Sequence, residues 1–133
     1  MVYPKERGQM IDRIFKAFQH YIQEQNYFDI VYSEKIGYVW LLVDQPSDAV
    51  ADVLDSPEAM LDSLFNDIIN DVVFSPSNPY HIPNSLILSE YEETESRRRI
   101  TAILETMGDD KDFCLDYLEK YLKEYQKNAL DLT

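Results

Sequence analysis

The chain has 133 residues, of which 45% are apolar and 28% are charged, and its formal net charge is −13. This length and composition are typical of one globular domain whose core is large enough to fold without a disulfide or a metal. The acidic balance argues against direct binding to nucleic acid or to an anionic membrane surface, because both require clustered lysine and arginine.

The negative charge is concentrated in the middle of the sequence. Residues 36–96 contain twelve aspartates and glutamates and no lysine or arginine, whereas residues 1–43 sum to zero and residues 97–133 sum to −1. A surface that serves only solubility usually mixes both signs. We therefore expect the segment 36–96, called the base-free segment below, either to be a solvated surface or to bind a basic protein.

The sequence favours a cytoplasmic protein. Cys114 is the only cysteine, which excludes an internal disulfide and fits a reducing compartment. The N-terminal residues contain no continuous apolar segment of the kind found in signal peptides. The longest apolar run, residues 38–43, is much shorter than a membrane span.

Residues 4–25 are predicted to form a helix, because apolar residues recur there at intervals of three and four and Pro4 suits a first turn. Two segments rich in aromatic and β-branched residues follow, at 27–33 and 38–44. The short connection between them ends in Gly37, which can adopt a positive φ. This pattern predicts a β-hairpin.

The second predicted strand is apolar on both faces, since Val39 and Leu41 alternate with Tyr38, Trp40 and Leu42. A strand with one face in water would alternate apolar and polar residues, so helices or a second subunit should cover both faces. A two-stranded sheet alone is marginally stable. We therefore expect heavy helical cover or a third strand, for which residues 85–88 are the only candidate.

Helices dominate the rest of the predicted fold. A short helix at 46–54 precedes a longer one at 57–73, where Ser56 is the N-cap and Pro57 takes the first helical position. Three prolines make residues 74–84 a stiff loop.

Two further helices complete the chain. Ser89 and Glu92 match a capping box at the start of a helix that reaches residue 107, and Gly108 is expected to end it in a left-handed conformation. Asp109 or Asp110 should cap the last helix, at 111–129. The predicted fold is therefore α+β and mostly helical, with an N-terminal helix, a β-hairpin and three to four packed helices in a single domain, 1–133.

Six carboxylates of the base-free segment would lie within an arc of about 120° if they shared one continuous helix. They are Asp44, Asp48, Asp52, Asp55, Glu58 and Asp62. Pro57 should divide this stripe into two pieces. The stripe is interpreted either as the solvated face of two amphipathic helices or as a surface that binds a basic protein. In its most specific form, the second interpretation is that the carboxylates imitate a nucleic-acid backbone.

The last predicted helix carries two adjacent rows at four-residue spacing. One row consists of Phe113, Tyr117, Tyr121 and Tyr125, and the other of Cys114, Leu118 and Leu122. Core packing is the simpler interpretation of both rows. If the tyrosines are exposed, they and Trp40 would suit a contact with a partner or with a second copy in a homodimer.

Other chemistry-bearing residues give weaker signals. Arg97, Arg98 and Arg99 are spaced to pair with preceding glutamates, which explains them better than a phosphate site does. Asp109, Asp110 and Asp112 do not continue into a calcium-loop pattern.

Among the histidines, His81 has the strongest claim to a site, because it lies beside Tyr80 in the proline-rich loop and functional residues concentrate on loops. No cofactor, metal or nucleotide motif is present in the sequence.

The sequence therefore predicts a small acidic cytoplasmic protein that acts as a non-catalytic interaction or regulatory module through residues 36–96. Two alternatives stay open: a ligand-binding or enzymatic domain with its site near residues 74–84, and a structural subunit of an oligomer. The preferred partner is a basic protein surface, and neither nucleic acid nor membrane is expected to bind directly.

Overall fold

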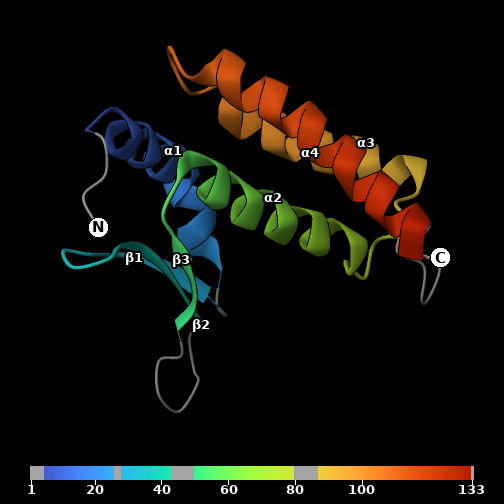
Figure 1. Cartoon of the computed structure of the whole chain (residues 1–133). Helices are drawn as coiled ribbons and strands as arrows, with labels where there is room; N and C mark the ends of the chain where they lie inside the picture. The colour runs from blue at the N-terminus through green and yellow to red at the C-terminus, as the bar shows by residue number, and fades with distance from the viewer. Residues whose placement is uncertain (1–4, 26–27, 43–49, 80–86, 133) are drawn as a thin grey trace. The chain divides into compact units, whose positions relative to one another are not determined.

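The computed structural model describes residues 5–25, 28–42, 50–79 and 87–132 (Figure 1). In chain order its elements are α1 (Lys5–Glu24), β1 (Phe28–Ser33), β2 (Gly37–Leu42), β3 (Val50–Leu54), α2 (Pro57–Val73), α3 (Glu90–Leu104) and α4 (Lys111–Leu132). The predicted α+β class with mostly helical content is confirmed. The chain divides into two compact units, Met1–Leu61 and Asp62–Thr133, and each is described by itself. The single domain 1–133 stays a prediction.

The first unit contains α1, whose predicted position at 4–25 is confirmed to within a residue. Its apolar residues repeat at three- and four-residue intervals, so they share one side of the helix. Ile11, Ile14, Phe18 and Ile22 are all buried. α1 packs against β1, which supplies Phe28 and Ile30 to the same core.

The predicted hairpin is also confirmed. β1 and β2 pair antiparallel from Phe28 opposite Leu42 to Ser33 opposite Gly37, and Gly37 has a φ of 88°. A positive φ is readily adopted by glycine, which has no Cβ to collide with the neighbouring carbonyl. The hairpin register places Tyr32 directly opposite Tyr38 near the turn.

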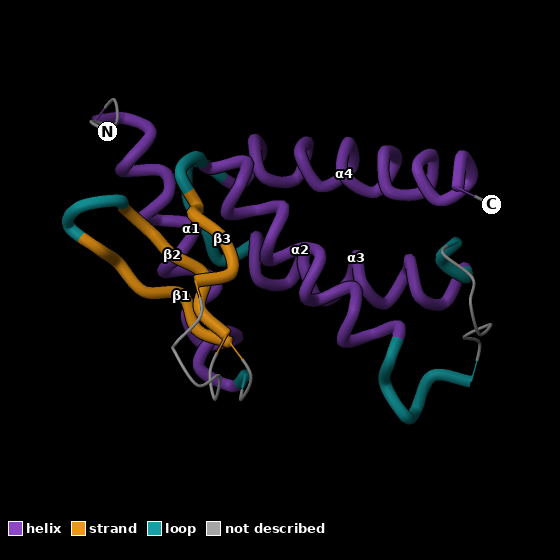
Figure 2. The backbone as a smooth tube through the Cα atoms, turned by 60° about the horizontal axis from the view of Figure 1, so that its bottom comes forward, coloured by secondary structure: helices purple, strands orange, loops and turns teal. Residues whose placement is uncertain are grey.

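A third strand was foreseen, but in the wrong segment. β3 pairs antiparallel with β2, which makes a three-stranded sheet in the order β1-β2-β3, drawn in orange in Figure 2. The predicted helix at 46–54 is therefore wrong for Val50–Leu54, and residues 46–49 lie outside the described residues. The five residues of β3 are too few for their sequence pattern to favour a helix strongly. Pairing with the apolar strand β2 therefore decides their conformation.

The candidate strand at 85–88 is not supported where it can be followed, because Ile87 and Leu88 belong to no strand. Residues 85 and 86 lie outside the described residues. Leu88 is buried, and its backbone N–H donates to the side-chain Oε1 of Gln126 on α4. Leu88 therefore belongs to the core of the second unit, whereas Ile87 is exposed.

α2 begins at Pro57 as predicted, with the Ser56 hydroxyl accepting a hydrogen bond of 3.0 Å from the backbone N–H of Ala59. Burial extends around much of the helix from Met60 to Val73. A helix buried on several sides is a core element. Within the second unit, the rings of Phe65 on α2 and of Tyr117 and Tyr121 on α4 are in contact.

α3 starts with the predicted capping box, in which the Ser89 hydroxyl and the Glu92 carboxylate each accept from the other residue's backbone N–H. It ends at Leu104, three residues earlier than predicted. Glu105 closes the helix in a right-handed conformation, and Gly108 has no positive φ. The predicted left-handed conformation of Gly108 at the end of α3 is wrong. The backbone N–H groups of residues 105–107 already donate hydrogen bonds to carbonyls of the last turn, so no left-handed residue is needed to satisfy them.

α4 runs from Lys111 to Leu132, three residues beyond the predicted end. The backbone carbonyl of Asp110 accepts the N–H of Cys114 at its first turn, so Asp110 stands at the predicted cap position. α3 and α4 pack against each other. Their buried residues include Ile100 and Leu104 on α3 and the row Cys114, Leu118 and Leu122 on α4.

Candidate functional site

The six carboxylates predicted to form one stripe belong to different kinds of element. Asp52 lies on β3, Asp55 follows that strand, and Glu58 and Asp62 lie on α2. Asp44 and Asp48 lie outside the described residues. The first helical piece of the predicted stripe is therefore wrong at Asp52 and Asp55, because side chains of a strand alternate between two faces and cannot continue the angular order of a helix. The second piece, Glu58 and Asp62, lies on a helix as predicted.

Carboxylates at the start of α3 are used within the protein. Glu92 is almost fully buried, and besides the capping box it accepts a hydrogen bond of 2.8 Å from the side-chain amide of Asn78. The same Asn78 amide donates to the carbonyl of Val73 at the end of α2. Glu92 thus holds the described part of the proline-rich segment against the start of α3.

The arginine triplet pairs with two other carboxylates of α3, Glu93 and Glu95. Arg97 contacts Glu93 at 3.1 Å and also Glu119 on α4, while Arg98 and Arg99 both contact Glu95. The hydrogen bonds from Arg98 and then Arg99 hold the pKa of Glu95 at about 2. The predicted i,i+3 and i,i+4 pairs are confirmed, so the triplet is engaged with carboxylates.

Asp52 and Asp55 differ from these paired acids. Both are exposed, and neither forms an ion pair with another described residue. Within the described residues, the Asp52 carboxylate accepts a hydrogen bond only from the backbone N–H of Val53, at 2.8 Å. Their charges therefore face solvent, in a part of the chain that contains no lysine or arginine.

Asp62 has a different environment within the second unit. Its Oδ1 accepts a hydrogen bond of 2.7 Å from the hydroxyl of Tyr117. The two residues line a cavity of about 360 Å³ with Lys120, Tyr121 and Glu124. Burial, and secondarily the charge of Asp62, raises the pKa of Tyr121. One predicted acidic residue and two predicted interface tyrosines are therefore brought together.

The aromatic residues predicted as an interface are half-buried and contact other rings of their own unit. Trp40 stacks on Phe28 with ring centroids 4.2 Å apart and planes inclined by 4°, and Tyr125 lies against Tyr121. Phe113 in the same row is exposed. Core packing thus accounts for much of the contact area of these rings.

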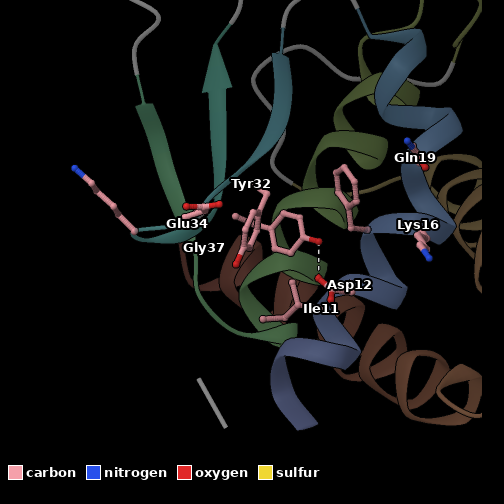
Figure 3. Close-up of a pocket in the computed structure, with 10 residues that line it drawn as sticks. Ile11, Asp12, Lys16, Gln19, Tyr32, Glu34 and Gly37 are labelled. Atoms are coloured by element: carbon pink, nitrogen blue, oxygen red, sulfur yellow. Dashed lines mark hydrogen bonds between the residues drawn. The ribbon is translucent and has the colours of Figure 1, made fainter. Parts of the chain in front are cut away.

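A cavity that sequence reasoning missed lies in the first unit, between α1 and the hairpin (Figure 3). Its volume is about 670 Å³, within the range of small-molecule sites. It is lined by Ile11, Asp12, Phe15, Lys16, Gln19, Tyr32, Glu34, Lys35, Gly37 and Tyr38. We call this cavity the Tyr38 cleft.

Three aromatic rings form one wall of the Tyr38 cleft. Tyr38 contacts Phe15 at 5.0 Å and Tyr32 at 5.3 Å between ring centroids, with interplanar angles of 34° and 67°. The Tyr38 hydroxyl donates a hydrogen bond of 2.6 Å to Oδ1 of Asp12, drawn as a dashed line in Figure 3. Burial, followed by this bond and the charge of Asp12, raises the pKa of Tyr38, so the hydroxyl keeps its proton.

The signal for this cleft in the sequence is indirect. The hairpin register pairs Tyr32 with Tyr38, and Phe15 lies at the edge of the apolar side of α1. Asp12 is 26 residues from Tyr38. No local motif joins the two, so only the packing of α1 on the sheet brings carboxylate and hydroxyl together.

Two other predicted positions have clear outcomes. His81 and Tyr80 lie outside the described residues, so the site proposed beside them stays a prediction. Cys114 is fully buried, and burial raises the pKa of its thiol to about 12. A protonated, inaccessible thiol is a packing residue, in agreement with its place in the apolar row.

Within the described ranges, no group of three or more His, Cys, Asp or Glu side chains is placed to hold a metal ion. Among the helices described there, none combines the length and apolar character that a bilayer span requires. Comparison with known proteins found no matching family model, no similar curated protein and no similar solved structure.

Proposed function

We propose that this chain is a non-catalytic interaction protein that binds a basic surface of another protein through the base-free segment. The observation that carries the proposal is that Asp52 and Asp55 are exposed and form no ion pair within the described residues, whereas Glu93 and Glu95 of α3 are paired with arginines. Charges that have no internal partner are available to an external one.

Electrostatic complementarity would contribute mainly to the rate and specificity of such an association. A patch of one sign accelerates encounter with a patch of the other sign and disfavours like-charged partners. Screening acts over about 8 Å at physiological ionic strength, so the complex should weaken as salt is added. The net charge of −13 adds to this long-range attraction.

The test begins with capture of partners by the full chain from a lysate, eluted in rising salt and identified by mass spectrometry. A retained basic protein is then purified and its Kd is measured at two salt concentrations. The doubly substituted variant Asp52→Asn, Asp55→Asn should bind more weakly. The matched control neutralises two exposed acids outside the base-free segment, Glu105→Gln and Asp109→Asn, and should leave the Kd nearly unchanged.

Equal loss of affinity in both double variants would show that only total charge matters and would contradict the assigned surface. A complex indifferent to salt would contradict its electrostatic basis. Competition between the chain and DNA or RNA for the same basic protein would support the more specific proposal that the carboxylates imitate a nucleic-acid backbone. Simultaneous binding of both ligands would contradict that specific proposal.

Self-association is favoured by one separate observation. Val31, Val39 and Val53 lie opposite one another across the three strands; Val39 is buried, but Val31 and Val53 on either side of it are 36% and 37% exposed. Exposed apolar side chains on the two outer strands of one sheet are suited to burial against a second copy. Sedimentation equilibrium should then show a dimer that Val31→Lys disrupts, whereas monomeric wild-type protein would exclude this alternative.

A further inference from the structure

We infer that the Tyr38 cleft binds an organic ammonium group, held by the aromatic rings of Phe15, Tyr32 and Tyr38 and by the carboxylate of Asp12. This inference goes beyond the proposed function, because the cleft lies on α1 and the hairpin, whereas Asp52 and Asp55 belong to β3 and the turn after it. Failure of either proposal leaves the other standing.

The three rings of the Tyr38 cleft are arranged as a cation-binding wall would be. Aromatic faces carry negative partial charge and attract cations within about 6 Å of the ring centre. The rings on either side of Tyr38 are inclined to it by 34° and 67°, so the wall they form is not flat. Tyr32 is 64% exposed, which is unusual for a ring that only packs a core and leaves its surface accessible to a ligand.

The carboxylate of Asp12 lies beside the rings. The Tyr38 hydroxyl donates to its Oδ1 at 2.6 Å, and this bond fixes the carboxylate against the aromatic wall. Within the described residues the second oxygen of Asp12 has no hydrogen-bond partner, so it can face a cation. Glu34 supplies another carboxylate to the lining, from the hairpin turn. Aromatic faces joined to carboxylates are the combination that recognises alkylated ammonium groups.

Lys16 and Lys35 also line the cleft and could bind an anion, but three observations oppose this. The proton of the Tyr38 hydroxyl is directed to Asp12 and is therefore not offered to an anion. Figure 3 shows Lys16 extending from the side of α1 away from Tyr32. Residues 1–61 carry five basic and ten acidic side chains, so their summed charge of −5 also repels anions.

The lining of the cleft suits an organic cation better than a metal ion. A metal ion would require several oxygen ligands in place of its hydration shell, and rings do not supply them. An alkylated ammonium is weakly hydrated and presents methyl groups that pack on aromatic faces. Such a group can come from a free quaternary amine or from a methylated lysine of another protein, and both sources share the chemistry that the cleft recognises.

The test uses the full ¹⁵N-labelled chain and follows backbone amide shifts by NMR. Choline chloride represents the free amine, and acetylated and amidated trimethyllysine represents the protein side chain. The neutral isostere 3,3-dimethyl-1-butanol controls for shape, and sodium phosphate at matched ionic strength tests the anion alternative. We expect saturable shifts in residues 11–19 and 32–38 with one or both ammonium ligands, and the tighter of the two identifies the source.

Two variants locate the site. Tyr32→Leu removes an exposed ring, and Asp12→Asn removes a charge on the helix surface, so both proteins should fold. Tyr32→Leu should raise the Kd about two- to fivefold, the equivalent of one cation–π contact at an accessible position. Asp12→Asn should raise it by a similar factor, the equivalent of one exposed ion pair. Tyr32→Phe keeps the ring and should retain the wild-type Kd. Asp29→Asn, an exposed neutralisation on β1, is the matched charge control and should also leave it unchanged.

Several results would overturn the inference. Equal binding of the neutral isostere would reduce the cleft to an apolar pocket. Shifts with phosphate but not with either ammonium ligand would reassign it to anions. An absence of saturable shifts with both ammonium ligands, or ammonium binding that is unaffected by Tyr32→Leu and Asp12→Asn, would remove the site altogether.

Discussion

The hydroxyl of Tyr117 on α4 donates a hydrogen bond of 2.7 Å to Oδ1 of Asp62 on α2, across 55 residues of sequence. Both residues are half-buried, and the ring of Tyr117 also contacts Phe65. The sequence suggested separate roles for the two residues, Asp62 in an acidic surface and Tyr117 in an apolar interface. In the fold they form one polar contact beside the core of the second unit.

Replacing Tyr117 by phenylalanine should lower the free energy of unfolding by about 1 kcal/mol, because the ring contacts remain and only the hydrogen bond is lost. Urea unfolding followed by circular dichroism measures this change. Tyr125→Phe is the matched control on the same helix. The Tyr125 hydroxyl forms no hydrogen bond within the described residues, so this variant should be as stable as the wild type. Equal stability of the Tyr117→Phe and wild-type proteins would show that this bond contributes nothing net.

The two described glycines that follow turns should respond to alanine in opposite directions. Gly37 has a φ of 88°, so Gly37→Ala should destabilise the protein by about 1 kcal/mol or more through backbone strain. Gly108 has no positive φ, and a Cβ added there meets nothing within 4 Å. Gly108→Ala should therefore be neutral or stabilise by about 0.4–1 kcal/mol, through the loss of freedom in the unfolded chain.

Thermal unfolding of both glycine variants beside the wild type tests this pair of predictions in one experiment. Each protein serves as the other's control, because the chemical change is identical and only the backbone conformation differs. A lower melting temperature for Gly108→Ala than for Gly37→Ala would contradict the conformations described at the two positions.

Elements with strong local signals were predicted correctly from sequence. The apolar side of α1, the hairpin around Gly37, the Ser56 cap and the capping box of Ser89 and Glu92 all depend on residues within a few positions of one another. β3 was missed because its strand character comes from pairing with β2, about a dozen residues away. The end of α3 was misplaced because the presence of Gly108 does not require a left-handed residue.

The sites show the same dependence on distance along the chain. The pairs of Glu93 and Glu95 with the arginine triplet follow from helical spacing and were predicted. The Tyr38 cleft was not predicted, because Asp12 and Tyr38 come into contact only when α1 packs on the sheet. The number of acidic residues was evident from sequence. Whether each of them is paired or exposed depends on the fold.

Cys114 should not react with thiol reagents in the native protein. Its side chain is fully buried and burial raises its pKa to about 12, so the reactive thiolate is both scarce and inaccessible at pH 8. Ellman's reagent should release no more than a trace of chromophore from the native chain and one equivalent after denaturation. Rapid reaction without denaturant would indicate that α4 opens locally, or that the packing around Cys114 differs from that described.

The pH dependence of Glu95 follows from its contacts with Arg98 and Arg99. These bonds hold the pKa of the folded carboxyl at about 2, below the ordinary value of 4.5 that applies in the unfolded chain. Because the folded state binds this proton less readily, the contribution to stability is present above pH 4.5 and is lost as the pH falls toward 2. NMR titration of the Glu95 side-chain carboxyl carbon should give a midpoint near 2.

Variants of the arginine triplet separate this cause from the general environment of α3. Arg98→Ala removes the larger contribution and should move the Glu95 midpoint toward its ordinary value. Arg97→Ala should leave the midpoint almost unchanged, because Arg97 pairs with Glu93 and Glu119 instead. A Glu95 midpoint near 4.5 in the wild type, or equal shifts in both variants, would show that the arginine contacts are too weak in solution to order this carboxylate.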